Sequence, residues 1–148
     1  MHYIGREIKM TQNLIQRLMD TTTRLNSQGG VSFSVKQICG YLYCNSDKPI
    51  YQKDLEKVFS LRRSSASAQL KKMEEKGLIT REGIPEDKRL KEIKLTPLAE
   101  KEVEKTIEEI KNIEAVISGG ITEDEAEALL KILKKIRLSI ENRLSQKH

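Results

Sequence analysis

Apolar residues recur along most of this chain at the three- and four-residue steps of an amphipathic helix, with charged residues between them. Near the N-terminus, Ile8, Ile15 and Leu18 follow this rhythm until Gly29-Gly30 interrupts it. The pattern predicts six helices. Four of them span residues 5–26, about 51–58, 97–118 and 122–145. Another begins at a cap at Ser34 and ends at about residue 44, and the last runs from a cap at Ser64 or Ser65 to a stop at Gly77.

Residues 52–96 change the rhythm in the middle of the chain. Ser60-Leu61 leaves only a short turn between two helices, which must therefore cross steeply. We expect these helices to pack through Leu55, Val58, Leu61 and Leu70. Residues 78–81 and 93–96 predict two short strands, joined by a polar loop at 83–89 that is too long for a tight hairpin. This order of elements is typical of a helix-turn-helix with a wing.

The predicted fold class is therefore mainly α with a small β-wing. A winged helix-turn-helix lobe over residues 34–96 is flanked by the helices of 1–28 and 97–148. Two of the later helices carry explicit start signals. Thr96 precedes Pro97, a residue favoured in a first helical turn, and Thr122 with Glu125 forms a capping box.

Composition excludes several other classes of protein. No apolar run approaches the ~20 residues that span a bilayer, and the N-terminus lacks the apolar stretch of a signal peptide, so we expect a cytoplasmic protein. His2 and His148 lie at opposite ends of the chain, which argues against a histidine metal site. No glycine-rich phosphate loop or paired catalytic residues are present. We expect neither a cofactor, nor a metal, nor enzymatic activity.

Positive charge is concentrated in the middle third of the chain. Residues 48–97 carry thirteen Lys and Arg against eight Asp and Glu, whereas residues 98–148 carry nine against eleven. Local positive charge is the footprint of a surface that binds phosphates, although a solvated lysine-rich face gives similar counts.

The second helix of the motif carries the candidate contacts to nucleic acid. Opposite its apolar stripe it exposes Arg62, Arg63, Ser64, Ser67, Gln69 and Lys71, and Ser65 and Lys72 are further candidates. The N-terminal half of such a helix faces base edges, where arginine pairs with guanine and glutamine with adenine. Serine hydroxyls suit phosphates, and Lys71 and Lys72 also complement the helix dipole.

The run LKKMEEKGLITR, followed by Asp87-x-Arg89 and the pair Leu95-Thr96, resembles the MarR family of winged helix-turn-helix regulators. That family shows Leu-Glu-x-x-Gly-Leu-(Ile/Val)-x-Arg, then Asp-x-Arg and Leu-Thr. Here Met73 stands where Leu is usual, and Ala99 stands where a glycine often follows the Thr. The resemblance extends to the order of elements over nearly the whole chain.

The resemblance implies a transcriptional regulator, most often a repressor in this family, that binds double-stranded DNA. It implies that Arg89, next to Lys88, reaches from the wing into the minor groove while Asp87 orients an arginine nearby. It also implies a homodimer on a pseudo-palindromic operator, formed by the terminal helices. Many relatives bind a small aromatic or anionic effector, but no motif marks a pocket for one in this chain.

The flanking helices carry more aliphatic surface than a winged helix alone can cover, which independently favours a two-fold dimer. Candidate interface residues are Ile107, Ile110, Leu129, Leu133 and Ile136, and each of them is equally compatible with an intramolecular core. Two alternatives remain at this stage. The fold could serve as a protein-interaction module without DNA, or regulation could proceed through oxidation of Cys39 or Cys44, whose spacing does not favour a disulfide.

Overall fold

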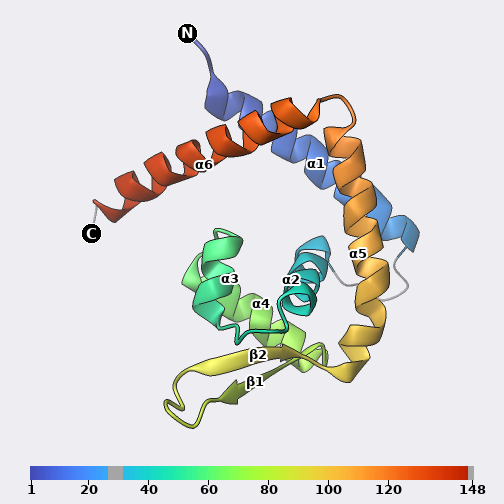
Figure 1. Cartoon of the computed structure of the whole chain (residues 1–148), viewed down its shortest axis with the longest axis vertical. Helices are drawn as coiled ribbons and strands as arrows, with labels where there is room; N and C mark the ends of the chain where they lie inside the picture. The colour runs from blue at the N-terminus through green and yellow to red at the C-terminus, as the bar shows by residue number, and fades with distance from the viewer. Residues whose placement is uncertain (27–31, 147–148) are drawn as a thin grey trace. The chain divides into compact units, whose positions relative to one another are not determined.

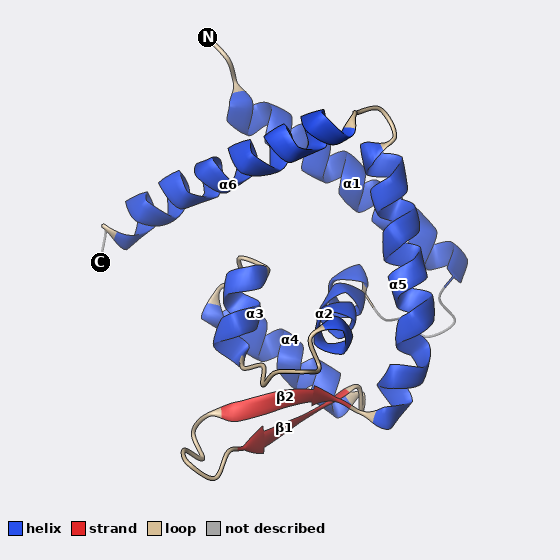
Figure 2. Cartoon of the chain, viewed as in Figure 1, coloured by secondary structure: helices blue, strands red, loops and turns tan. Residues whose placement is uncertain are grey.

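The computed structural model describes residues 1–26 and 32–146, which form six helices and one two-stranded sheet (Figures 1 and 2). In chain order the elements are α1 (Ile4–Asn26), α2 (Phe33–Cys44), α3 (Gln52–Val58), α4 (Arg63–Glu75), β1 (Ile79–Gly83), β2 (Lys91–Leu95), α5 (Pro97–Ser118) and α6 (Glu123–Ser145). The predicted fold class is confirmed. The predicted helix stop at Gly29-Gly30, and His148, lie outside the described residues.

The chain divides into two compact units, residues 1–111 and residues 112–148. The first unit contains the helix-turn-helix and the wing. The second contains the end of α5 and all of α6, which starts at the predicted capping box. The Thr122 hydroxyl accepts the Glu125 N–H at 3.2 Å, and the Glu125 carboxylate accepts the Thr122 N–H at 2.8 Å.

The core of the first unit lies between α2, α3, α4, α5 and the two strands. Its most deeply buried side chains are Leu55, Leu70, Met73, Ile79 and Val103. Ala66 is also buried, so the predicted stripe of α4 is confirmed. Val58 is 49% exposed, and its expected place in this contact is wrong. The next residue packs there instead, because the Phe59 ring meets the Tyr41 ring edge-on at 5.8 Å.

Two helices start earlier than predicted. The cap of α2 is Ser32, whose hydroxyl accepts the Val35 N–H, and Ser34 lies inside the first turn. Starting there lets α2 bury Phe33 as well as Val35. The cap of α4 is Arg62, in an extended conformation, rather than Ser64 or Ser65. Because the turn before it is so short, the Arg62 carbonyl already accepts the Ala66 N–H at 2.9 Å.

The C-terminal stop of α4 is at the predicted residue. Gly77 has φ +70°, a conformation that costs a residue with a Cβ roughly 1–2 kcal/mol. Its N–H donates to the Glu74 carbonyl, and the Leu78 N–H donates to the Met73 carbonyl. These two bonds define a Schellman motif, which turns the chain directly into β1.

The wing is an antiparallel pair in which Ile79 faces Leu95 and Gly83 faces Lys91. Both strands extend two residues further toward the loop than predicted, because the backbone pairing continues through polar positions. The Ile93 N–H also donates to the Ile50 carbonyl at 2.8 Å, which ties β2 to the segment before α3. Thr96 caps α5 as predicted, accepting the Ala99 N–H at 3.2 Å.

Candidate nucleic-acid interface

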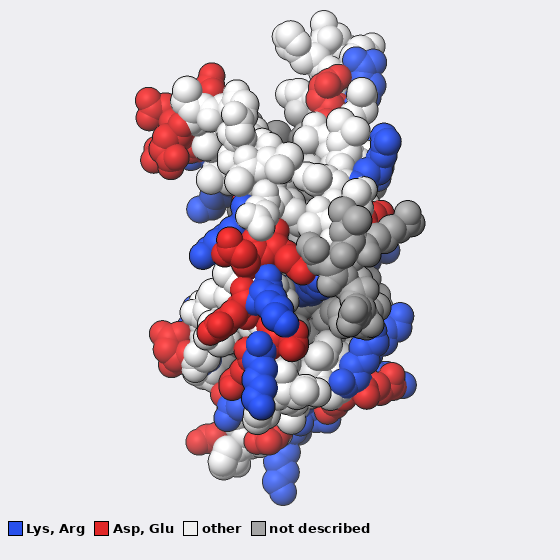
Figure 3. All heavy atoms as spheres, turned by 90° about the vertical axis from the view of Figure 1, so that its right-hand side faces the viewer, with Lys and Arg blue, Asp and Glu red and all other residues white. Residues whose placement is uncertain are grey.

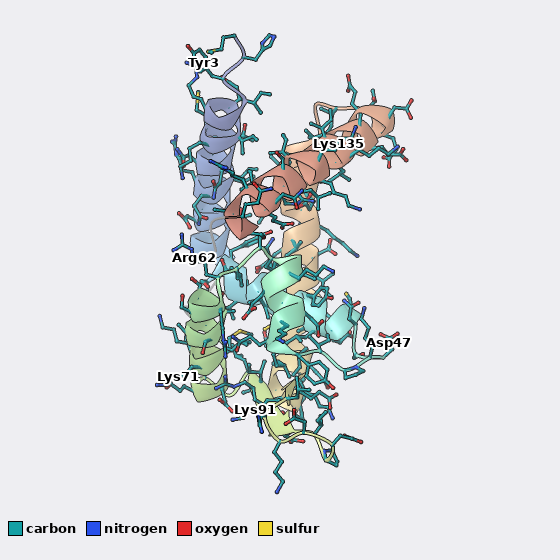
Figure 4. The ribbon with its side chains drawn as sticks, turned by 90° about the vertical axis from the view of Figure 1, so that its left-hand side faces the viewer. Tyr3, Asp47, Arg62, Lys71, Lys91 and Lys135 are labelled. Carbon is teal, nitrogen blue, oxygen red and sulfur yellow. The ribbon has the colours of Figure 1, made fainter. Side chains whose placement is uncertain are left out.

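The outer face of α4 is the candidate surface for a DNA groove. Helical spacing places Ser64, Ala68 and Lys71 opposite the buried stripe, and all three are exposed. In Figure 4, α4 lies at the edge of the lobe with Arg62 at its start and Lys71 near its end. Ala68 was missed from the sequence because it has no polar group. Its 64/68/71 spacing was the available signal, and a small side chain there allows close approach to base edges.

The start of α4 is held in place by residues of α3 and the turn. Ser60 has φ +49°, which makes the turn compact enough to bring α4 against α3. The Gln52 side-chain amide donates to the Glu56 carboxylate at 3.0 Å and to the Arg63 carbonyl at 3.3 Å. Sequence reasoning missed Gln52, since nothing in its own segment shows that it spans the two helices.

Most of the predicted α4 residues are exposed, and one is not. Gln69 is half-buried and faces the start of α2. The exposed predicted residues are Arg62, Arg63, Ser64, Ser65, Ser67, Lys71 and Lys72 on α4, with Lys88 and Arg89 on the loop between the strands. All of them belong to the first unit, so one compact unit presents both groups.

A groove of about 380 Å³ lies between the start of α2 and the flank of α4. Its lining residues are Ser32, Ser34, Val35, Ser65, Ala68, Gln69, Lys72, Met73 and Lys76. The groove offers hydroxyl, amide and ammonium donors beside the positive end of a helix dipole. Ser32 and Ser34 were not predicted as contacts, because only tertiary packing brings the start of α2 to α4.

The wing tip is folded tightly on itself. The Asp87 carboxylate accepts the Arg89 N–H at 2.9 Å, and the Asp87 carbonyl accepts the Leu90 N–H at 3.1 Å. A Cβ on Gly83 would lie 3.1 Å from the Lys88 carbonyl oxygen, so a larger residue there would require the loop to shift by a few tenths of an ångström. Asp87 therefore shapes the backbone that presents Lys88 and Arg89, and its predicted action on an arginine side chain stays a prediction.

Arg81 is occupied within the protein. Its Nε and Nη2 donate to one Glu74 carboxylate oxygen at 3.0 and 2.6 Å, and its side chain is 21% exposed. This ion pair ties β1 to the end of α4. The sequence contained both residues within a single motif, but only the fold shows that they form a pair.

The two cysteines have different environments. Cys39 is buried, and this burial raises the pKa of its thiol to about 11, so it stays protonated at neutral pH. Cys44, at the end of α2, is exposed and also free. A protonated, buried thiol reacts slowly with oxidants because the thiolate is the reactive form.

The predicted dimerisation residues occupy mixed positions. Ile107 and Ile110 are half-buried on α5, and Ile107 packs against the core of the first unit. On α6, Leu129 is exposed, whereas Leu133 and Ile136 are half-buried.

Charge on the α5 side of the molecule is mixed. In Figure 3, which views the side on which α5 lies in Figure 1, acidic and basic side chains alternate without a continuous basic patch. Over residues 1–26 and 32–146, no group of three or more His, Cys, Asp or Glu is placed to hold a metal ion. Within the same residues, no helix is long and apolar enough to cross a bilayer.

Known proteins resemble this chain in sequence and in fold. The MarR family model matches residues 42–91. YdgJ of Bacillus subtilis (strain 168), named as an uncharacterized HTH-type transcriptional regulator, is 27% identical over 113 residues, covering 76% of this chain and 68% of that protein. Crystal structures of two regulators share the fold. MarR from Oenococcus oeni PSU-1 has 29% identity, a TM-score of 0.78 and coverage of 90% of this chain and 97% of its own. The MepR–DNA complex of S. aureus has 24% identity, a TM-score of 0.81 and coverage of 95% and 99%.

Proposed function

Because the chain belongs to the MarR family of transcription regulators, we propose that it binds an operator in double-stranded DNA as a homodimer and acts as a repressor. The family consists of regulators, so the chain is not an enzyme. Binding to DNA agrees with the cytoplasmic location that we expect from the sequence.

The observation that carries this proposal is the exposed outer face of α4, with arginines at its start and lysines toward its end. A recognition helix enters the major groove with its N-terminal residues at the base edges. Arg62 and Arg63 are in that place, while Ser65 and Lys72 line the groove beside α2 and suit the flanking phosphates. MepR of S. aureus and a MarR variant of E. coli, which share this fold, have been crystallised with DNA.

The wing supplies the second contact. Asp87 and Gly83 fix a tight loop from which Lys88 and Arg89 project into solvent. A narrow minor groove attracts arginine through its enhanced negative potential. Glu86 and Asp87 lie next to these cations in the sequence, so we assign the wing a smaller share of the affinity than α4.

The apolar residues of α6 support the homodimer. Leu130, Ile140 and Leu144 are each more than half exposed, at 63%, 54% and 60%. Leaving such a stripe in water is unfavourable by roughly 25 cal/mol per Å², and an identical stripe on a second copy is the simplest cover. Two copies would then present two α4 helices to successive major grooves, about 34 Å apart.

A small-molecule effector belongs to the same proposal. A second groove, of about 470 Å³, lies between α1 and α2, with Ile15, Met19 and Phe33 beside the amides of Gln12, Gln16 and Gln37. Its volume falls within the range of small-molecule sites, and its mixed lining suits an apolar body with one polar edge. An effector that prefers one spacing of the α4 helices would change operator affinity.

The direct test is selection of bound genomic DNA, followed by fluorescence anisotropy titration of the selected fragment at several salt concentrations. We expect the logarithm of the affinity to fall linearly with the logarithm of the salt concentration, with a slope near 0.9 per neutralised phosphate. Repeating the titration with candidate aromatic acids and with an oxidant tests whether either of them releases the protein from DNA. Undetectable binding at low salt would refute DNA regulation and favour the protein-interaction alternative.

Two substitutions test the assigned geometry. Arg63→Ala should weaken operator binding by roughly tenfold or more and reduce the preference over unrelated DNA, because a base contact is worth about 1–3 kcal/mol. Arg89→Ala should weaken binding more evenly among sequences that share an A/T-rich flank. Lys105→Ala, which removes one exposed cation from α5, controls for net charge. Wild-type affinity in both arginine variants would contradict this geometry.

A further inference from the structure

The most buried ion pair among residues 1–26 and 32–146 joins α2 to α5. Lys36 Nζ lies 2.6 Å from Glu109 Oε2, and the two side chains are only 11% and 19% exposed. The other ion pairs within these residues each have at least one side chain more than 40% exposed. Seventy-three positions separate Lys36 from Glu109, so this pair constrains tertiary structure rather than one helix.

One turn further along α2, Gly40 faces two isoleucines of α5 across space for one methyl group. A Cβ on Gly40 would lie 3.6 Å from Ile110 Cδ1 and 3.9 Å from Ile107 Cγ1. Lys36 and Gly40 are four residues apart and therefore share one face of α2. Ile107, Glu109 and Ile110 occupy one turn of α5. The contact between the helices thus combines apolar packing of α5 isoleucines with one charged pair at its edge.

The other side of α2 faces the recognition helix. Val35, Ile38 and Leu42 belong to the same buried cluster as Leu70 and Met73 of α4. Val35 and Met73 also line the groove beside α4. A continuous path of packed residues therefore leads from Glu109 on α5, through α2, to the helix that would enter DNA.

We propose that Lys36 and Glu109 are positioning residues for DNA recognition, which hold α2 against α5 and thereby fix α4 relative to α5. This inference rests on the proposed function. The physical reason is that breaking a half-buried pair leaves a charge that must find water. Lys36 would swing outward, and α2 would shift with it. A dimer that reads two half-sites needs a fixed distance between its α4 helices, so such a shift weakens operator binding.

Glu109→Gln provides a test in which two effects have opposite signs. The substitution removes a negative charge, so general electrostatics alone would tighten binding to DNA. Loss of positioning instead weakens it, and we expect about a fivefold fall in operator affinity, at the low end of typical coupling between sites. Glu108→Gln is the matched control, because it removes the same charge from an exposed neighbour on α5. It should leave the affinity unchanged or slightly tighter.

Charge exchange tests the pair itself. Lys36→Glu alone places two carboxylates together and should weaken operator binding more than Glu109→Gln does. Adding Glu109→Lys to it restores the pair in reverse and should recover most of the affinity, even if the single variant is poorly folded. Circular dichroism and sedimentation verify that each protein compared is folded and in the wild-type oligomeric state.

The outcomes separate the two proposals. If the wild-type protein binds no DNA, the proposed function fails, and the positioning role fails with it. If the wild type binds, but Glu109→Gln binds equally or more tightly, only the positioning role is overturned. A charge-exchange variant that binds no better than Lys36→Glu alone overturns it in the same way.

Discussion

At the scale of single residues, the wing shows how one residue type acquires two roles within a few positions. Arg81 is held by two contacts to Glu74 and fastens β1 to α4. Arg89 makes its described hydrogen bond through its backbone N–H, which leaves its guanidinium in solvent. A sequence motif contains both arginines without distinguishing them. The difference comes from the partner that the fold brings to each.

The cysteines give a prediction at this scale. In the native protein at pH 8, a thiol reagent should label Cys44 and leave Cys39 unmodified, because burial raises the pKa of Cys39 to about 11 and blocks access. Native protein should therefore take up one equivalent and denatured protein two, as counted by mass spectrometry. Cys44→Ser should reduce native labelling to near zero.

The raised pKa of Cys39 also makes the free energy of unfolding depend on pH. Below pH 9 both the folded and the unfolded chain carry a protonated Cys39 thiol, so the free energy of unfolding does not depend on it. Between about pH 9 and 11 the unfolded chain loses this proton first, and stability falls as the pH rises. Cys39→Ala should remove this contribution. Rapid labelling of native Cys39 at pH 8 would contradict both statements.

At the scale of elements, two glycines of the first unit differ in whether their backbone conformation accepts a residue with a Cβ. Gly77 has φ +70° at the end of α4, whereas Gly40 lies in the middle of α2 with space for a methyl group beside Ile110. Gly77→Ala should lower the free energy of unfolding by about 1 kcal/mol or more, since alanine strains the left-handed turn. Gly40→Ala should raise it by about 0.5–1 kcal/mol, because alanine is the better helix former.

These two variants control for one another, since each adds the same methyl group. Urea unfolding followed by circular dichroism measures both, and equal slopes would show that the unfolded state is unchanged. Stabilisation by Gly77→Ala, or destabilisation by Gly40→Ala, would be inconsistent with the geometry of α4 and α2.

The sequence predicts a helix end correctly where the residues that cap it lie within one turn of that end. Gly77 ends α4 and Thr122 with Glu125 starts α6, because capping involves only residues within a turn. The start of α2 was placed two residues late, since both Ser32 and Ser34 can cap a helix. The choice between them is decided by burial of Phe33, which depends on tertiary packing.

The candidate site divides in the same way. Arg62, Arg63 and Lys71 followed from the period of one helix, and Arg89 was identified through the family motif. Gln52, Ser32 and the pairing of Lys36 with Glu109 were not predictable. Each of them acts on another element of the fold, and a single sequence carries no record of such contacts.

At the scale of the whole molecule, the two units differ in how much of their apolar surface is exposed to water. The first unit buries its aliphatic side chains in a core, as Leu55 and Met73 show. The second exposes a long apolar stripe on α6 and contains few residues with which to cover it. Stability and assembly are therefore separable. A substitution on the exposed part of α6 should leave the first unit intact and act on association.

Leu129→Asp tests this separation. Leu129 is 46% exposed within one copy, so aspartate there should cost little in the monomer. In the proposed dimer it would place a carboxylate in the apolar contact twice, once from each copy. Losing about 1.5–3 kcal/mol per leucine would weaken association by roughly 10²- to 10⁴-fold. Sedimentation at micromolar concentration should then show monomers, whose circular dichroism still reports the full helix content.

Ala128→Asp is the matched control, because it introduces the same carboxylate one position away, at an exposed position off the apolar stripe. This protein should remain dimeric and bind operator DNA like the wild type. The Leu129→Asp monomer retains one α4 and one wing, so it should lose the gain in affinity that comes from joining two half-site contacts. If Leu129→Asp sediments as the wild type does, the α6 stripe is not the dimer contact, and α1 and α5 become the remaining candidates.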